Sequence, residues 1–598
     1  MQRMHVWAGL AMAALVILLG GWMILSPGWV TARLQEAVRA QMSRDIEVEG
    51  GAHLELSPLA VRLDRVRLFD SDTPDDAFVT AREVRIPITL AGLLSRHIEL
   101  TQATLVAPEF AFLVSERGEA NWALPAPKTP QDIKLEMQDA KIRFFDTRND
   151  QGFALSGGTL TADLAADGGI ALSGTVVLHD RLAKVDASLK SLERVHEDGS
   201  PFDLSLSAPD LDVSLEGRLA TAKTLSLAGT ASASGKALYP ALAWIGIRTG
   251  REGGPRFSVT GALETAGRAF AAKKSEIVFG EDVLSGDISF DFRDEIPVLE
   301  AVLTGDSLDL STFVPDTGIG ADDWGRNPLG LGALRVLDAK LAITANSLHY
   351  SGITAGPSQV AVTLDKGKFD GQINMSDLAG GQASLQVSAD ATVTPPSISL
   401  GFASSGADLE TVLTPLGLGL ITGLGDISLQ VSGQGTTQQE LIGTLKGEAS
   451  LSAADGLLRG IEIPALFAAA SQKIVDGWSG AAGASTMFSS LAARATISDG
   501  IAALADLTLT SPTLSLTGRG DVDLLRRAVN LRVDPRIVSG VNGTSAGLPV
   551  SLVVAGPWTT PRIYPDIPDI LTKPAQGFES LRAMGLQQLT PAPVAPAN

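Results

Sequence analysis

The chain has 598 residues, a formal net charge of −20, 45% hydrophobic residues and only 5% aromatic residues. That hydrophobicity excludes a disordered polymer, and the length exceeds what one hydrophobic core normally supports. The negative charge and the lack of a Lys/Arg stripe argue against nucleic acid as a partner. The absence of cysteine excludes disulfides, thiolate catalysis and Cys-ligated zinc.

The first predicted element is an apolar segment at residues 7–25, which contains no charged residue. At ~1.5 Å of rise per residue, such a helix matches the ~30 Å hydrocarbon core of a bilayer. We predict a single transmembrane anchor with the rest of the chain in the periplasm, because Arg3 precedes the segment and no second apolar span follows. The alternative is a cleaved signal peptide, against which the length of the run argues. The residues expected in the membrane are Trp7, Leu15, Leu18, Trp22 and Leu25.

A short amphipathic helix is expected next, because Val30, Leu34, Ala37 and Val38 recur at helical spacing. Such a helix lies either on the outer leaflet or against the first strands. We favour packing on the strands, since an apolar stripe usually faces a protein core.

Beyond residue 46 the apolar period changes from helical to two, which predicts strands with one apolar face. Tight hairpin turns are predicted at Asp167-Gly168, Asp455-Gly456 and Asp499-Gly500. Helical interruptions are expected only at 240–247, 323–337 and 463–478, the last with an apolar face that includes Trp478. The predicted fold is mainly β, an elongated and twisted antiparallel sheet that forms a groove after the N-terminal transmembrane helix.

The predicted organisation has five segments. They are an anchor (1–28), an N-terminal β-module (29–125), a central elongated β-body (126–400), a C-terminal β-domain (401–570) and a Pro/Ala-rich tail (571–598). The Pro-rich stretch at 124–130 is interpreted as a linker.

The apolar face of such a sheet must be buried on helices, on a second sheet or on an apolar ligand. Helices are too few, which leaves a closed sandwich or a curled sheet whose groove holds acyl chains. The low aromatic content favours the groove. In that case the lipid-contact candidates are Ile427, Leu429, Val431, Leu507, Leu509, Leu514 and Leu516, whereas in a sandwich the same residues pack a core.

No residue pattern supports catalysis. The six histidines stand at no metal-ligand spacing, and His349-Tyr350 has no nucleophile pattern beside it. The Gly-rich run at 417–425 lacks the Lys-Ser/Thr of a phosphate loop. We therefore expect no enzyme, no catalytic residues, no cofactor and no metal.

Several short motifs follow one another along the chain. They are Pro58-Leu59-Ala60-Val61, Leu93-Leu94, Gly118-Glu119-Ala120-Asn121-Trp122, Ser307-Leu308-Asp309-Leu310, Leu334 to Ala339, Gly380-Gly381, Asp455 to Gly460, Thr486-Met487-Phe488, Gly518 to Leu524 and Pro565-Asp566. With these motifs the chain resembles the AsmA family of bacterial envelope proteins over most of its length, and least between residues 130 and 300.

The resemblance implies an inner-membrane protein whose groove-like β-body lies in the periplasm. It implies a part in phospholipid transport between the inner and outer membranes and in outer-membrane homeostasis, without catalytic residues. The expected partners are phospholipids, the inner membrane, and outer-membrane or periplasmic proteins. The alternative is a non-enzymatic assembly factor or regulator that binds outer-membrane proteins through exposed strand edges. An envelope hydrolase ranks third.

Overall fold

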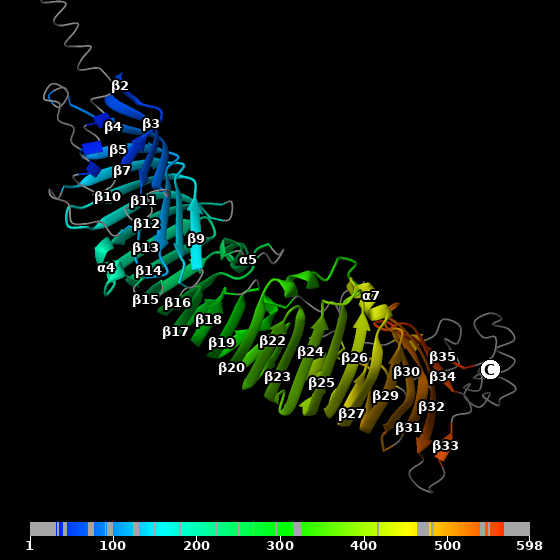
Figure 1. Ribbon diagram of the computed structural model, residues 1–598. Coiled ribbons are helices and arrows are strands. Elements are labelled where there is room, and N and C mark those ends of the chain that lie inside the picture. The colour runs from blue at the N-terminus through cyan, green and yellow to red at the C-terminus, as the bar shows by residue number, and fades with distance from the viewer. Residues whose placement is uncertain are drawn as a thin grey trace, which may run out of the picture. The chain divides into compact units, whose positions relative to one another are not determined.

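The computed structural model describes residues 31–566 with gaps, of which the longest are 92–99, 123–130, 315–323 and 463–477. The predicted anchor at 7–25, the linker at 124–130 and the C-terminal tail lie outside the described residues. Among the described helices, none is long and apolar enough to cross a membrane. The mainly β fold is confirmed (Figure 1). The single transmembrane helix stays a prediction.

The described chain divides into two compact units. Unit 1 comprises residues up to 280 together with 287–294, and unit 2 comprises residues 281–286 and the chain from 295 onwards. Strand β18 (Asp282–Asp291) contributes residues to both. The five predicted segments stay a prediction.

Unit 1 is built almost entirely from strands. They are β1 (Ile46–Val48), β2 (Ala52–Leu56), β3 (Leu59–Phe69), β4 (Ala77–Pro87), β5 (Gln102–Val106), β6 (Glu109–Val114), β7 (Ile133–Gln138), β8 (Lys141–Asp146), β9 (Gln151–Ser156), β10 (Thr159–Leu164), β11 (Ile170–Leu178), β12 (Arg181–Leu189), β13 (Ser200–Ala208), β14 (Leu211–Ala220), β15 (Ser226–Gly235), β16 (Phe257–Ala266) and β17 (Ala269–Phe279). The helical elements are α4 (Leu192–His196), α5 (Leu238–Leu242) and the 3₁₀ helix η1 (Ala243–Ile245). The last two confirm the helical interruption predicted at 240–247.

The sheet of unit 1 bends where interruptions of neighbouring strands lie side by side. Residues with positive φ separate β5 from β6 (Ala107, 49°), β7 from β8 (Asp139, 55°) and β9 from β10 (Gly157 and Gly158, 80° and 85°). Hydrogen bonds join the breaks, because the Ala107 N–H donates to Gln138 O at 2.8 Å and the Asp139 N–H donates to Gly158 O at 2.8 Å. Aligned irregularities of this kind curl a sheet (Figure 1). The strands of unit 1 share one cluster of buried apolar side chains.

Most strand pairs of unit 1 are antiparallel, as predicted, but β5–β7 and β6–β8 are parallel. The predicted juxtamembrane helix is present at the described residues 31, 32, 35, 36, 38 and 39. Val38 is buried against the strands, and the Gln35 side-chain amide donates to Ile46 O at 3.1 Å. The structure thus confirms that this helix packs on the first strands.

Unit 2 is one long run of strands. They are β19 (Val298–Asp309), β20 (Asp338–Tyr350), β21 (Ile353–Ala355), β22 (Ser358–Asp365), β23 (Lys368–Leu378), β24 (Gly381–Asp390), β25 (Ser397–Asp408), β26 (Leu424–Gln434), β27 (Lys446–Arg459), β28 (Trp478–Ser479), β29 (Ser485–Ser498), β30 (Ile501–Thr510), β31 (Leu514–Asp523), β32 (Ala528–Val538), β33 (Ser545–Gly547), β34 (Leu552–Pro557) and β35 (Arg562–Pro565). The helical elements are η2 (Leu310–Thr312), η3 (Leu331–Arg335), α6 (Leu409–Leu413) and α7 (Gln438–Gly443).

Three local predictions for unit 2 are wrong. Strands β19 and β20 are parallel and not antiparallel. The chain between them must therefore run back from the end of β19 to the opposite end of the strands, where β20 begins. The helix predicted at 323–337 is limited to the 3₁₀ turn η3, and Trp324 instead packs on the Arg527 guanidinium at 3.9 Å. Of the helix predicted at 463–478, residues 463–477 lie outside the described residues, and Trp478 is in strand β28, where it pairs with Ile563.

The predicted hairpin turns have two outcomes. Asp499-Gly500 forms the turn between β29 and β30, with φ of 49° and 74°. Asp455-Gly456 does not form a turn, because both residues lie within β27. There the positive φ of Asp455, 46°, distorts a continuous strand. The Asp-Gly sequence thus adopts a turn at one position and a distorted strand at the other.

Candidate functional site

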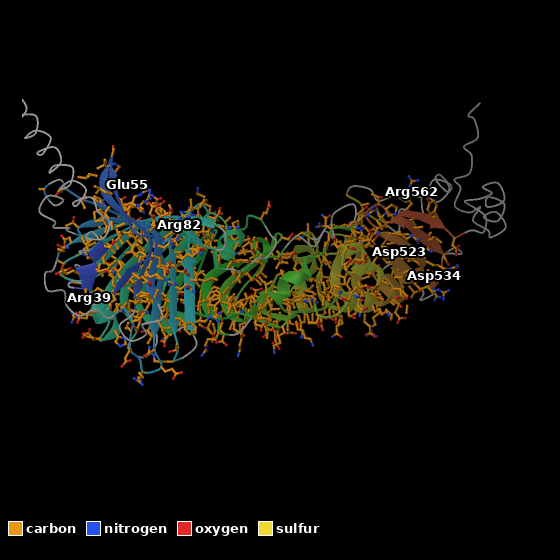
Figure 2. The ribbon with its side chains drawn as sticks, turned by 45° about the horizontal axis from the view of Figure 1, so that its top comes forward. Arg39, Glu55, Arg82, Asp523, Asp534 and Arg562 are labelled. Atoms are coloured by element: carbon orange, nitrogen blue, oxygen red, sulfur yellow. The ribbon has the colours of Figure 1, made fainter. Side chains whose placement is uncertain are left out.

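Unit 1 holds a cavity of about 400 Å³ in its curled sheet. Every lining residue except Gln102 is apolar, and typical members are Val66, Val84, Leu135 and Leu172. Val66 and Val84 are buried, whereas Leu135 and Leu172 are half-buried and keep surface open to the cavity. Charged side chains such as Glu55 and Arg82 lie at the outer surface of the unit (Figure 2). The interior is therefore chemically suited to hydrocarbon.

The alternation of β3 shows how the sequence builds this interior. Val61 and Leu63 face inward, and Arg65 then adopts a positive φ of 51°. That conformation changes the phase of the alternation, so that Val66 and Leu68 line the cavity. The partner strand β4 matches it through Leu63↔Val84 and Val66↔Ala81. A strict period of two would have placed Arg65 in the apolar interior.

Aromatic rings form one wall of the cavity. Trp122 is 5% exposed and packs on Phe112 and Phe144, with centroid distances of 5.7 and 5.9 Å. Phe112 in turn meets Phe78 edge-on at 5.6 Å. Because Phe78, Phe112 and Trp122 all line the cavity, the ring cluster fixes its shape at this end.

The Asn-Trp motif of the sequence is the turn that places this wall. Gly118 has φ of 81°, a conformation that glycine adopts without strain. The Leu113 N–H donates to Asn121 Oδ1 at 2.9 Å, and Asn121 Nδ2 donates to Ala111 O at 2.7 Å. Asn121 therefore satisfies the backbone of β6 and turns Trp122 toward the cavity.

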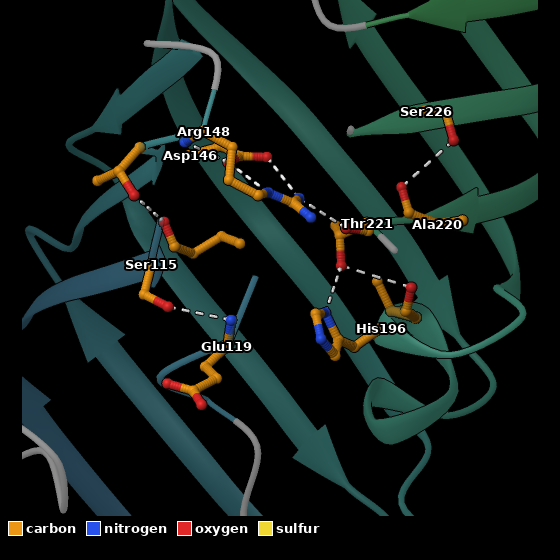
Figure 3. Close-up of polar contacts among 11 residues, drawn as sticks. Ser115, Glu119, Asp146, Arg148, His196, Ala220, Thr221 and Ser226 are labelled. Carbon is orange, nitrogen blue, oxygen red and sulfur yellow. Dashed lines mark hydrogen bonds and ion pairs between the residues drawn. The ribbon is translucent and has the colours of Figure 1, made fainter. Parts of the chain in front are cut away.

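A buried ion pair lies at the end of β8, two residues beyond Phe144 of the ring cluster (Figure 3). Asp146 at the end of β8 has no exposed surface, and it accepts hydrogen bonds from Arg148 Nε at 2.9 Å and from Arg148 Nη2 at 2.7 Å. Arg148 Nη2 also donates to Thr221 O at 2.9 Å, beyond the end of β14. Thr221 Oγ1 lies 3.4 Å from His196 Nδ1 in α4, the helix whose Leu192 lines the cavity.

The contacts between Asp146 and Arg148 determine the ionisation of both side chains. Burial alone would raise the pKa of Asp146, but the hydrogen bonds and the charge of Arg148 outweigh it and hold that pKa below its ordinary value. The hydrogen bond with Asp146 raises the pKa of Arg148. Both groups are thus charged near neutral pH, and the pair ties β8 to the end of β14, where Thr221 contacts α4.

Unit 2 presents a second apolar surface, which runs across the strands. Directly opposed residues on neighbouring strands form one row: Ile343, Val360, Ile373, Leu385, Phe402 and Leu429. Of these, only Val360 is fully buried. The alternate positions, such as Asn374, Ser384 and Gln430, are polar and exposed. The described residues thus leave this apolar face partly uncovered, which favours a groove over a closed sandwich.

The predicted lipid-contact residues all lie on strands of unit 2 and fall into two environments. Ile427, Leu429, Val431 and Leu507 are half-buried and keep surface for a ligand. Leu509, Leu514 and Leu516 are 2%, 2% and 6% exposed and pack in a core with Phe488 and Leu491. Contact with lipid stays a prediction for all seven residues.

Sequence reasoning missed the cavity of unit 1. Its lining comes from residues as far apart as Val38 and Leu192, and the curl that gathers them depends on aligned strand breaks. The usable signal was the phase change between Leu63 and Val66, together with the Asn121-Trp122 pair. Among the described residues, no group of His, Asp and Glu is arranged to hold a metal ion.

The sequence is similar to known proteins of one family. The AsmA family model matches residues 1–141 and 278–507. Protein AsmA of Escherichia coli (strain K12) is 24% identical over 238 residues, which cover 38% of this chain and 38% of that protein. No solved structure matches. Because the family model spans more than half of the sequence, the chain belongs to the AsmA family.

Proposed function

We propose that the protein holds the acyl chains of phospholipids in its apolar β-surfaces and takes part in their transport between the inner and outer membranes. The observation that carries the proposal is the cavity of about 400 Å³ in unit 1, whose lining is apolar apart from Gln102. An apolar wall in contact with water costs ~25 cal/mol per Å², and each methylene group that fills it contributes ~0.8 kcal/mol. Hydrocarbon is therefore the occupant that the cavity favours.

The chemistry of the lining disfavours polar occupants. A sugar or peptide in this cavity would lose its hydrogen bonds to water and find few replacements, at a cost of roughly 1–3 kcal/mol per group. Headgroups would remain outside in water, while acyl chains enter. Specificity would then rest on the shape of the apolar part of the ligand, including the ring wall at Trp122.

The apolar row of unit 2 supports a passage rather than a single pocket. The row crosses strands β20 and β22–β26 from Ile343 to Leu429, and at ~4.8 Å per strand it extends for roughly 24 Å. One leaflet of a bilayer holds its acyl chains in ~15 Å. The half-buried row therefore offers more length than one acyl chain needs, which suits movement along the surface.

The same proposal includes the location of the protein. Membership of the AsmA family supports a role in the cell envelope. Residues 7–25 would serve as one inner-membrane span, with the β-structure in the periplasm, as their uncharged apolar sequence favours.

Quantification of bound lipid tests the proposal. The full chain would be purified in a mild detergent, and its lipids would be extracted and measured by mass spectrometry beside Leu172→Asp and Ser173→Asp variants. Leu172 lines the cavity, whereas its neighbour Ser173 is exposed on the opposite face of β11, so the pair is matched in strand and charge.

We expect co-purified phospholipid that falls several-fold in Leu172→Asp and is retained in Ser173→Asp. Circular dichroism would show that both variants keep the β-fold. A folded wild-type chain without phospholipid contradicts the proposal and favours the assembly-factor alternative.

A further inference from the structure

The outer face of unit 2 near its C-terminal strands carries an unusual row of charges. Register places Arg494 on β29 opposite Asp506 on β30, and Arg519 on β31 directly opposite Arg532 on β32. Like charges at directly opposed positions of an antiparallel pair destabilise the sheet. The Arg519–Arg532 pair therefore costs stability that some other interaction has to offset.

The two arginines differ in what holds them. Arg532 forms an ion pair with Asp566, and its Nη2 donates to Ser551 Oγ at 3.3 Å. Arg519 makes no hydrogen bond or ion pair with any residue that the structure describes. One guanidinium is thus fixed in place and the other is left with all its donors open to a ligand.

A strand irregularity opens a hollow at this pair. The register of β30 shifts between Leu504 and Leu507 relative to β31, and an extra residue at such a bulge re-aims the side chains around it. The resulting hollow has a volume of about 440 Å³, and its lining includes Ala503, Ala505, Arg519, Asp521, Asn530 and Arg532. The alanines, on β30, leave room beside Arg519.

We propose that Arg519 and Arg532 bind a phosphodiester group in this hollow. The planar fork of the Arg519 guanidinium matches two phosphate oxygens, and Arg532, held on the neighbouring strand by Asp566, adds a second guanidinium beside it. The two guanidiniums are balanced by the carboxylates of Asp521, in the lining, and of Asp566, which pairs with Arg532. Without an excess of positive charge, the hollow suits a singly charged diester better than a dianion. Asn530 adds an amide donor for a further oxygen.

The inference does not depend on lipid in the apolar groove. Arg519, Asp521 and Arg532 occupy exposed positions of β31 and β32. Leu504 and Leu531, which also line the hollow, are half-buried, and Val533 is buried. A phosphodiester could come from a headgroup at a membrane surface or from a soluble molecule. The two sources share the recognition chemistry and differ in the probe that reveals them.

The test uses the full chain in nanodiscs of phosphatidylcholine. Flotation would measure its binding to vesicles that contain phosphatidylglycerol and to vesicles of pure phosphatidylcholine, and calorimetry would measure its binding to soluble glycerophosphoglycerol. The variants are Arg519→Gln and, as a control, Arg82→Gln, an exposed arginine of unit 1 (Figure 2).

We expect phosphatidylglycerol-dependent binding that falls about tenfold in Arg519→Gln, because one charge-assisted fork is lost, and that is unchanged in Arg82→Gln. Arg519-dependent binding of glycerophosphoglycerol alone would identify a soluble source and also support the site. Binding of both probes that is equal in wild type and Arg519→Gln, or that falls equally in both variants, overturns the inference.

Discussion

The Leu113 N–H and the Asn121 side chain meet at 2.9 Å, and this hydrogen bond sets the direction in which Trp122 enters the cavity of unit 1. Through this contact the Asn121-Trp122 motif positions the ring wall. It also makes the wall dependent on one amide, since Asn121 Nδ2 donates to Ala111 O on the same strand.

Replacement of Asn121 tests this dependence. Asn121→Ala removes both side-chain hydrogen bonds to β6, keeps the backbone bond from the Asn121 N–H to Leu113 O, and is expected to lower the free energy of unfolding by about 2 kcal/mol. Asn121→Asp keeps the acceptor for the Leu113 N–H and loses the donor, so it should cost less. Urea denaturation followed by Trp fluorescence measures both, and equal costs for the two variants would contradict this role of the Leu113 contact.

The Asp146–Arg148 pair predicts a pH dependence. The pKa of Asp146 in the folded protein is below its unfolded value, so the carboxylate contributes stability that is present above about pH 4 and is lost as pH falls through the folded pKa. Asp146→Asn should therefore lower the unfolding free energy by about 2 kcal/mol at pH 7, and the deficit should shrink below about pH 4. Urea titrations between pH 7 and 3 provide the measurement.

Asp186→Asn is the control for that series. Its carboxylate faces Lys184 at 3.5 Å at the surface, where an ion pair is worth about 0–1 kcal/mol. A deficit of Asp146→Asn that stays constant down to pH 3 would show that its charge does not stabilise unit 1.

The aligned strand breaks predict a difference between two glycines of the same backbone conformation. Gly158 has φ of 85° and Gly51 has φ of 83°. A Cβ at Gly158 would lie 1.9 Å from Thr175 O, whereas at Gly51 it would meet nothing within 4 Å. Gly51→Ala should cost about 1 kcal/mol from backbone strain alone, and Gly158→Ala a further ~1–3 kcal/mol because the neighbouring strand must move.

Thermal unfolding of these two variants measures the difference. A similar loss of melting temperature in both would mean that the close approach of β9/β10 to β11 is not needed for the curl. A larger loss in Gly158→Ala would identify that approach as a determinant of the cavity.

The sequence predicted the apolar face of unit 2 well, because the alternation of Ile427, Leu429 and Val431 depends only on the local period of a strand. The sequence did not predict the features that depend on pairing between residues far apart in the chain. Nothing in the residues of β19 and β20 distinguishes a parallel from an antiparallel pair, and Trp478 suits a helical face as well as its observed pairing with Ile563. The cavity of unit 1 was missed for the same reason, since its curl depends on breaks that lie side by side only in the folded sheet.

The split among the predicted lipid-contact residues also has a physical cause. Leu507 and Leu509 share one face of β30, but Leu509 lies directly opposite Leu491 and Leu516 and is covered by the core around them. Leu507 lies opposite Ala493 and Gly518, which are small, and it stays half-buried. Periodicity indicates the face of a residue, whereas the size of its cross-strand neighbours decides whether it is available to a ligand.

Site-specific photo-crosslinking in cells tests the central claim most directly. A photoreactive phenylalanine analogue at Phe402 or Leu429 would sit on the half-buried apolar row, and the same analogue at Ser428 or Gln430 would sit on the exposed face of β26. We predict phospholipid adducts, identified by mass spectrometry of the purified chain, at Phe402 and Leu429 and not at Ser428 or Gln430. Adducts absent from all four positions, or equally frequent on both faces, would contradict transport along the apolar surface.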